Sequence, residues 1–363
     1  MNKNKLTAAL KKKALGAAIA VAVSTPAFAD VTMFGIVDIG IGTDSSDNET
    51  LRVDGGEGRV IELPSIWGIK GSEDLGGGLT ASFALESDLE ASTGGTNRGG
   101  TTLSDSGARF WARQANISLS NDMGSLTLGR IYSPALLAIA GVDPRSFYES
   151  QSGLVQYATI AGTTNTNTHV DVFLANSVQV AFNPGPLKVA IAYGAGETSD
   201  SGANSNTHVG VTYAVEDLTV MANYIQNKGN NTANDSLGEN QKQAFGAKYT
   251  MGDIKLGGYY IQGESTSTAG VETEAKGYGL GVTFMSGSSE FDVAYYNTEV
   301  EDATDAETDD IILAYRNNLS DRTTLYAKLC SSDKGANSSN LGACNGAAGQ
   351  NETYYGVGVF HKF

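Results

Sequence analysis

The chain has 363 residues, among them 45 Gly, 16 Tyr and only 6 Pro, and its formal net charge is −16 at pH 7. This acidic balance argues against nucleic acid as a partner, because binding to phosphates needs basic patches. It favours small cations over small anions in any aqueous passage that the chain lines.

The first 29 residues predict a cleaved signal peptide. Five Lys precede an apolar run over residues 14–23, and Ala27-Phe28-Ala29 forms a small-x-small cleavage pattern. The alternative, a transmembrane anchor, needs ~20 apolar residues, about twice the length of this run. We therefore expect an exported mature chain over residues 30–363, a single domain with a net charge near −21.

The mature sequence is a series of short segments in which apolar side chains alternate with small or polar ones. The pattern starts at residues 32–42 and returns at 79–85, 187–193, 209–215, 218–224, 291–295 and 325–329. Because side chains alternate faces along a strand, this period of two predicts β-strands with one apolar face. The Gly and Tyr enrichment suits the strands of a membrane β-barrel, and it suits a large β-sandwich as well.

The lengths of the connections distinguish these two folds. Seven short turns alternate with eight long polar loops, which predicts sixteen strands with both chain ends on the turn side. Short turns at one end and long loops at the other are typical of membrane barrels, and an even strand number closes them. The second face of the strands is rich in Gly, Thr, Ala and Ser, which suits a water-filled lumen. We therefore predict an all-β fold, a transmembrane antiparallel 16-stranded β-barrel.

The third loop, residues 132–168, is the longest connection, with 37 residues. Loops of this length are usually functional or disordered. Residues 134–140 are apolar after an initial Pro, which predicts a short helix, and residues 141–149 then add acids and aromatics. An apolar segment on a barrel has to be buried, and the lumen is the available place. We expect this loop to fold inward; the alternative is an ordered external Ω-loop.

Two cysteines, Cys330 and Cys344, lie fourteen positions apart. An exported chain passes through an oxidising compartment, and no His accompanies the pair at zinc-site spacing. We therefore predict a disulfide that staples a loop, and no metal site.

An acidic run over residues 299–310 lacks the Gly and Glu spacing of a calcium loop. We interpret it as a solvated external loop, with weak divalent bridging to lipopolysaccharide as the alternative. The sequence contains no nucleophile elbow, phosphate loop or metal motif, so we predict no enzyme activity and no cofactor.

The chain ends in an alternating segment with Tyr355, Val357, Val359, His361 and Phe363 on one face. Lipid offers no partner to an open strand edge, so a membrane barrel has to pair its last strand with its first. We predict that the terminal segment pairs with the one that starts near residue 31, and that its apolar face meets lipid or a neighbouring subunit.

Four internal segments and the C-terminus together resemble the general trimeric porin family of Gram-negative outer membranes. They are residues 33–38 (MFGIVD), 67–79 (WGIKGSEDLGGGL), 113–116 (RQAN), 124–130 (GSLTLGR) and 359–363 (VFHKF). The resemblance spans the whole mature chain and is most specific at 71–79 and 124–130. It implies a homotrimer in the bacterial outer membrane, surrounded by lipid and lipopolysaccharide, that passes ions and small hydrophilic solutes.

The resemblance also implies a pore constriction. In that family the inward third loop narrows the pore, and its acids face basic residues on the barrel wall. Residue by residue, Lys70 and Arg113 fall at basic wall positions of that pattern, and Asp143 and Glu149 are the loop acids.

The sequence departs from the family pattern at three places on the wall. Ile36 and Ile66 occupy inward positions where many relatives carry a basic residue, and residues 170–180 include no Arg or Lys. We therefore expect a cation-preferring general diffusion channel. One alternative is a substrate-selective porin with a solute-binding constriction, and another is a structural or adhesive barrel with a plugged lumen.

Two further residues receive roles from the sequence. Arg130 shares the parity of Leu126 and Leu128, so we expect it to face outward and to contact a neighbouring subunit. The alternative is a rim arginine bound to water or to lipopolysaccharide phosphate. Phe363 is similar to the family's C-terminal assembly signal, in which the last aromatic residue is recognised by the barrel-insertion machinery.

Overall fold

The computed structural model describes residues 30–44, 51–55, 60–95, 110–148, 151–160, 172–196, 205–228, 237–267, 270–301, 303–338, 343–344 and 351–363. The predicted signal peptide, residues 1–29, lies outside the described residues, and so does Glu149.

Sixteen long strands and one short strand of the described residues form a single antiparallel sheet. The short strand, β2 (Arg52–Asp54), belongs to the first loop and pairs with β1 beyond the end of the β1–β3 pairing. The long strands are β1 (Asp30–Asp44), β3 (Ile66–Gly76), β4 (Leu79–Asp88), β5 (Gln114–Asn121), β6 (Gly124–Tyr132), β7 (Phe173–Phe182), β8 (Leu187–Gly194), β9 (Asn206–Val215), β10 (Leu218–Lys228), β11 (Leu237–Met251), β12 (Ile254–Ser267), β13 (Glu272–Ser286), β14 (Ser289–Val300), β15 (Glu307–Asn318), β16 (Thr323–Lys334) and β17 (Glu352–Lys362). The predicted 16-stranded antiparallel barrel is confirmed.

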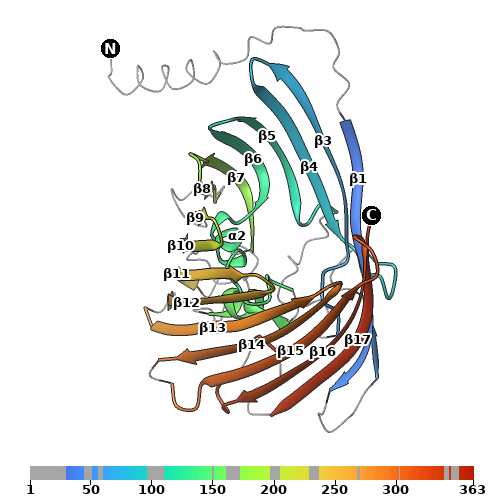
Figure 1. Ribbon diagram of the computed structural model, residues 1–363. Coiled ribbons are helices and arrows are strands. Elements are labelled where there is room, and N and C mark those ends of the chain that lie inside the picture. The colour runs from blue at the N-terminus through green and yellow to red at the C-terminus, as the bar shows by residue number, and fades with distance from the viewer. Residues whose placement is uncertain are drawn as a thin grey trace.

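The barrel closes because β17 pairs with β1, from Ile36 opposite Lys362 to Asp44 opposite Tyr354. Two further backbone hydrogen bonds extend this pairing to the last residue. The Phe363 N–H donates to the Gly35 carbonyl at 3.0 Å, and the Gly35 N–H donates to the Phe363 carbonyl at 3.1 Å. Figure 1 shows β17, in red, beside β1, in blue. The backbone groups of both terminal strands thus find partners inside the protein, as lipid surroundings require.

The two faces of the strands differ as the alternation predicts. Large apolar side chains on one face are exposed: Val357 by 57% and Leu280 by 55%. Charged side chains on the other face are buried; Arg316 on β15 is only 1% exposed. A belt of exposed apolar side chains around a barrel is the surface that lipid covers, and the polar face then lines the lumen.

The third loop connects β6 to β7 and contains two short helices, α2 (Pro134–Ala140) and α3 (Gly153–Thr159). Ser133 caps α2, because its Oγ accepts the Leu136 N–H at 3.2 Å, and Pro134 provides the first helical position. No helix of the described residues is long and apolar enough to cross a membrane.

The third loop lies inside the barrel. Helix α2 packs against β8, β9, β10 and β11, and α3 packs against α2 and β14. Buried loop residues such as Ile139 and Tyr157 share one hydrophobic cluster with wall residues such as Ile225 and Tyr296. The predicted helix and the inward fold are confirmed, and the external Ω-loop is excluded. Figure 1 shows α2 within the curve of the strands.

Candidate pore constriction

Glycines on the inner face of the wall let the third loop lie directly against the strands. A Cβ atom added at Gly257 on β12 would lie 2.7 Å from the Val142 carbonyl oxygen, and one at Gly281 on β13 would lie 2.8 Å from Pro144 Cβ. A Cβ at Gly210 on β9 would overlap the backbone of Pro134. Side chains at these positions would push the loop away from the wall, so the glycines allow its close contact with the strands.

Asp143 organises the turn of the loop that follows α2. Its Oδ2 accepts the N–H groups of Arg145 and Phe147, both at 2.9 Å, and its Oδ1 accepts the Gly153 N–H at 3.1 Å. The Tyr296 hydroxyl of β14 donates to Oδ1 at 3.0 Å. Burial raises the pKa of Asp143 to about 6, although these donors and the Arg145 charge oppose the shift.

This environment corrects the prediction that Asp143 is a pore-lining acid. The side chain is 0% exposed and fixes the loop to the wall. The physical reason is that several N–H groups of a tight turn converge on one carboxylate, which residue type and loop position alone did not show. Glu149, the second predicted loop acid, lies outside the described residues, and its role in the constriction stays a prediction.

Arg145 joins the third loop to the first loop and to the barrel wall. Its Nη2 donates to both oxygens of Glu62, at 2.8 and 2.9 Å, and its Nε lies 3.6 Å from Asp292 on β14. Arg316 on β15 donates to Glu62 at 3.2 Å, to Glu290 at 3.0 Å and also to Asp292. We call these five residues, Glu62, Arg145, Glu290, Asp292 and Arg316, the Glu62 network.

The Glu62 network is a buried contact between opposite charges. Glu62, Arg145, Asp292 and Arg316 are each at most 3% exposed. Burial opposes ionisation of Glu62, but the nearby charges of Arg145, Lys328 and Arg316 outweigh it and hold the pKa of Glu62 below its usual value. Glu62 therefore stays ionised at neutral pH, and the network ties the third loop across to the first loop.

Sequence reasoning did not single out any member of this network. Glu62 lies in the first loop and is 83 positions from Arg145 and 254 from Arg316. Three of its members did carry a signal, since Glu290, Asp292 and Arg316 stand at inward positions of otherwise clearly alternating strands. Their partners in the loops have no such periodicity.

Arg113 is not the open basic wall residue that the family pattern implies. Its Nε donates to Glu86 at 2.7 Å and its Nη1 to Asp88 at 2.9 Å, both on β4, and the residue is 6% exposed. The Tyr132 hydroxyl donates to the same Glu86 oxygen at 2.7 Å. Because two inward acids of β4 take up its charge, Arg113 stabilises the start of β5 and offers little free charge to the pore.

Lys70 is exposed on the inward face of β3, at the basic position that the family pattern implies. Its Nζ is 5.1 Å from the centre of the Phe34 ring. The structure does not bring Lys70, Arg113 and Asp143 together into one cluster. Arg113 binds β4, Asp143 binds β14, and among the described residues neither makes a hydrogen bond or ion pair with Lys70.

Arg130 follows Gly129, which has φ +121° at a register shift between β6 and β7. The Arg130 Nε donates to the Ala112 carbonyl at 2.5 Å, and its guanidinium carbon lies 5.2 Å from the centre of the Phe173 ring. Close to such a register shift, the alternation of side chains along the strand does not reliably indicate the face on which Arg130 lies. These contacts are within the subunit, and the subunit-contact role of Arg130 stays a prediction.

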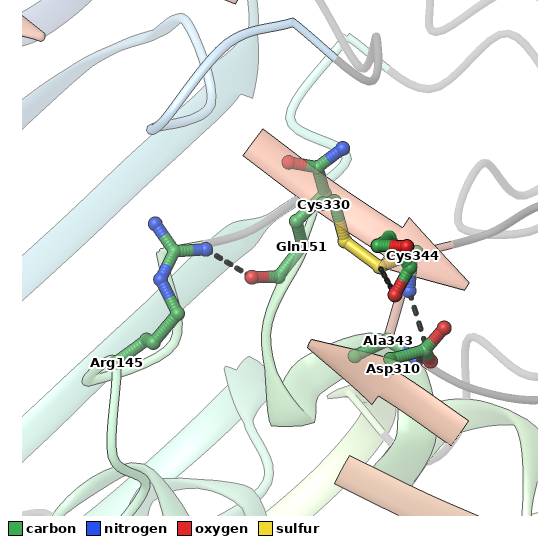
Figure 2. The surroundings of a disulfide bond; sticks show 7 residues. Arg145, Gln151, Asp310, Cys330, Ala343 and Cys344 are labelled. Atoms are coloured by element: carbon green, nitrogen blue, oxygen red, sulfur yellow. Dashed lines mark hydrogen bonds between the residues drawn. A yellow bond between two sulfur atoms is a disulfide. The ribbon is translucent and has the colours of Figure 1, made fainter. Parts of the chain in front are cut away.

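A disulfide joins Cys330 on β16 to Cys344 in the last loop, with the Cα atoms 6.0 Å apart. The Cys344 N–H donates to Asp310 at 3.2 Å, and the Ala343 N–H also binds this carboxylate. Figure 2 shows Gln151 of the third loop in the same region, with its carbonyl bound by Arg145. The last loop is thus fastened to the inner wall close to the third loop.

Comparisons with known proteins point to one group. A family model described as Gram-negative porin matches residues 16–337. Outer membrane porin protein 32 of Delftia acidovorans is 28% identical over 377 residues, which cover 97% of this chain and all of that protein. An outer membrane porin protein of Bordetella pertussis is 33% identical, over 37% of each chain. The match to the latter thus spans little more than a third of that relative.

Solved structures with the same fold include two informative ones. An anion-selective porin from Comamonas acidovorans superposes with a TM-score of 0.77 at 26% identity, covering 92% of this chain and all of that one. A trimer form of OmpT from Vibrio cholerae has a TM-score of 0.67 at 15% identity, with 92% and 99% covered. The second likeness bears on the fold alone.

Proposed function

Because the chain belongs to the Gram-negative porin family of the outer membrane, we propose that it forms a water-filled passage for passive diffusion of ions and small hydrophilic solutes. The observation that carries this proposal is the third loop inside a closed barrel. The loop is pressed against β9, β11, β12 and β13 at glycines and is fixed across the lumen by the Glu62 network. Such a loop narrows a barrel at one level. We assign the chain no catalytic activity.

Liposome swelling tests the proposal. Vesicles that contain the purified protein should swell in isotonic solutions of small sugars, at rates that fall steeply as the sugar becomes larger. Swelling no faster than that of protein-free vesicles, for every sugar, would instead favour a plugged structural barrel.

The preference for cations, expected from the net charge, is proposed to arise at the extracellular rim. Exposed carboxylates of Asp305, Glu307 and Asp333 gather there at a hollow, Glu307 and Asp333 on the outward face of β15 and β16. The inner wall opposes this preference, because Lys70 and Lys188 are exposed on it. The porin from Comamonas acidovorans, which has the same fold, is described as anion-selective.

Ionic strength should separate the contribution of the acidic rim to ion selectivity from that of the lysines on the inner wall. Salt shortens the screening length from about 10 Å at 0.1 M to about 3 Å at 1 M, so rim charges lose their reach into the passage. We expect reversal potentials to show cation preference in dilute KCl gradients and much less in concentrated ones. Chloride preference in the dilute gradient would contradict the proposed role of the rim.

We further propose that the protein assembles as a homotrimer and that Arg130 supports the contact between subunits. One structural neighbour is described as a trimer form. The Arg130→Ala variant should dissociate to monomers at a lower temperature than wild type in mild detergent. An unchanged dissociation temperature would remove Arg130 from the contact.

Phe363 is proposed as the assembly signal. It is 43% exposed, and its backbone pairs with Gly35 at the closing seam. Deletion of Phe363 should leave export intact but lower the amount of barrel inserted in the outer membrane. Normal insertion of the shortened chain would refute this role.

A further inference from the structure

Two lysines face the lumen side by side beneath the third loop. Lys248 on β11 pairs with Gly257 on β12, and Lys255 on β12 pairs with Thr250 on β11. The two lysines are therefore diagonal neighbours on one face of adjacent strands, a separation within the reach of long side chains. That face is the inner one, because Gly257 contacts the third loop.

The pair lies on the turn side of the constriction. Gly246 and Gly257 touch Val142 of the third loop, and each lysine stands two residues from one of these glycines, toward the short turn at residues 252–253. Short turns of outer-membrane barrels are periplasmic. A solute that crosses from outside meets these two ammonium groups just after it has passed the loop.

Neither lysine has a partner among the residues that the structure describes. No hydrogen bond or ion pair joins Lys248 or Lys255 to them, whereas the arginines of the lumen, Arg113, Arg145 and Arg316, all bind carboxylates. The charged groups that act on Lys248 are Lys255, with the same sign, and Asp143.

Asp143 acts on Lys248 through its charge, but among the described residues it forms no ion pair with either lysine. Its carboxylate is buried and already accepts three N–H groups and one hydroxyl. The two ammonium groups, both half-buried, therefore repel each other on the inner face of the sheet. Like charges on neighbouring strands destabilise a sheet, and an anion that bridges them would relieve this repulsion.

We propose that Lys248 and Lys255 form a binding step for small polyvalent anions, such as phosphate or dicarboxylates, on the periplasmic side of the constriction. This inference rests on the proposed channel function. It names a solute class, small polyvalent anions, for the alternative in which the channel is substrate-selective. One charge pair ~5 Å apart in water changes the affinity about fourfold, and two lysines about tenfold or more in dilute salt.

Planar-bilayer recordings in about 0.1 M KCl test the proposal, with inorganic phosphate added to one chamber at a time. In wild type, phosphate should block the single-channel current in a saturable way, and more strongly from the periplasmic side. The concentration for half block should rise about fourfold in Lys248→Gln and in Lys255→Gln, and roughly tenfold in the double variant. Lys188→Gln serves as the matched control. It removes the same charge from the inner face of β8, with no second lysine beside it, and should shift the half-block concentration less than about twofold.

The outcomes separate this inference from the channel function. If wild type conducts and the two single variants are blocked by phosphate as strongly as wild type, the binding step is refuted while the channel stands. If the wild-type protein gives no conductance, the channel function itself fails. Should the double variant not insert, Lys248→Arg with Lys255→Arg keeps the charges; loss of block in that variant would also contradict the proposal.

Discussion

Replacement of Glu62 by Gln should loosen the third loop without damage to the barrel. The substitution keeps the shape of the side chain and removes the charge that Arg145 and Arg316 both bind. Arg145 and Arg316 then keep Asp292 and Glu290 as their carboxylate partners, in a site from which water is largely excluded. The excess positive charge destabilises the contact that joins the third loop to the first loop.

The size of the effect follows from the burial of the network. Loss of one partner from a buried ion pair costs about 3–5 kcal/mol, because an uncompensated charge is left behind. Since every 1.4 kcal/mol is a factor of ten, even about 3 kcal/mol raises the ratio of detached to docked loop roughly 100-fold. Excursions of the loop that are rare in wild type should then become visible as current noise and substates.

Single-channel recording measures this directly, with Glu301→Gln as the control. Glu301 pairs with Lys276 at 3.2 Å, but both side chains are more than a third exposed. Exposed pairs are screened by water and contribute little to stability. A Glu62→Gln channel as quiet as the Glu301→Gln channel, with the same mean conductance, would refute the anchoring role of the Glu62 network. Heat-modified mobility in detergent gels should show that both barrels are intact.

Three further predictions concern the same loop and its surroundings. The pKa of Asp143 is raised to about 6 in the folded protein, so the folded state binds more protons than the unfolded one between the ordinary pKa of an aspartate and pH 6. The docked loop should therefore become more stable as pH falls from about 8 to about 5, and the current noise of wild type should decrease. The noise of Asp143→Asn should not depend on pH over this range. Greater noise in wild type at the lower pH would contradict the prediction. Gly257→Ala places a Cβ against the Val142 carbonyl and should change the conductance. The Cβ of Gly258→Ala meets Leu280 and the Gly279 carbonyl instead of the third loop, so this variant should conduct like wild type. Equal conductances of the two variants would contradict the proposed role of the contact between Gly257 and the third loop. Replacement of Cys330 and Cys344 by Ser opens a short covalent loop and should lower the unfolding free energy by about 3 kcal/mol, seen as a lower unfolding temperature; no decrease would mean that the disulfide is dispensable.

The sequence predicted the barrel well because its strands obey a strictly local rule. Alternation with period two places Val293 and Val357 outward, where they are exposed, and the alternation of short and long connections gives the strand number. The apolar content of residues 134–140 likewise predicted both the helix and its burial. Each of these inferences needs only neighbours in the chain.

The contacts inside the lumen could not be predicted in the same way. Arg113 precedes β5, so its parity within the strand is undefined, and its carboxylate partners Glu86 and Asp88 are 27 and 25 positions away. Asp143 is buried by a turn in which Ser146 and Phe147 adopt positive φ. Glu62 meets Arg145 only because the first and third loops bring both side chains into the same buried site. Such pairings depend on tertiary geometry that no local pattern records.

The conductance of single molecules in planar bilayers tests the central claim most directly. The purified protein should insert in uniform steps, and each step should rise nearly in proportion to salt concentration, as expected for a water-filled passage that the third loop narrows but leaves open. An inserted, heat-modifiable barrel that gives no conductance steps at any salt concentration would contradict the account.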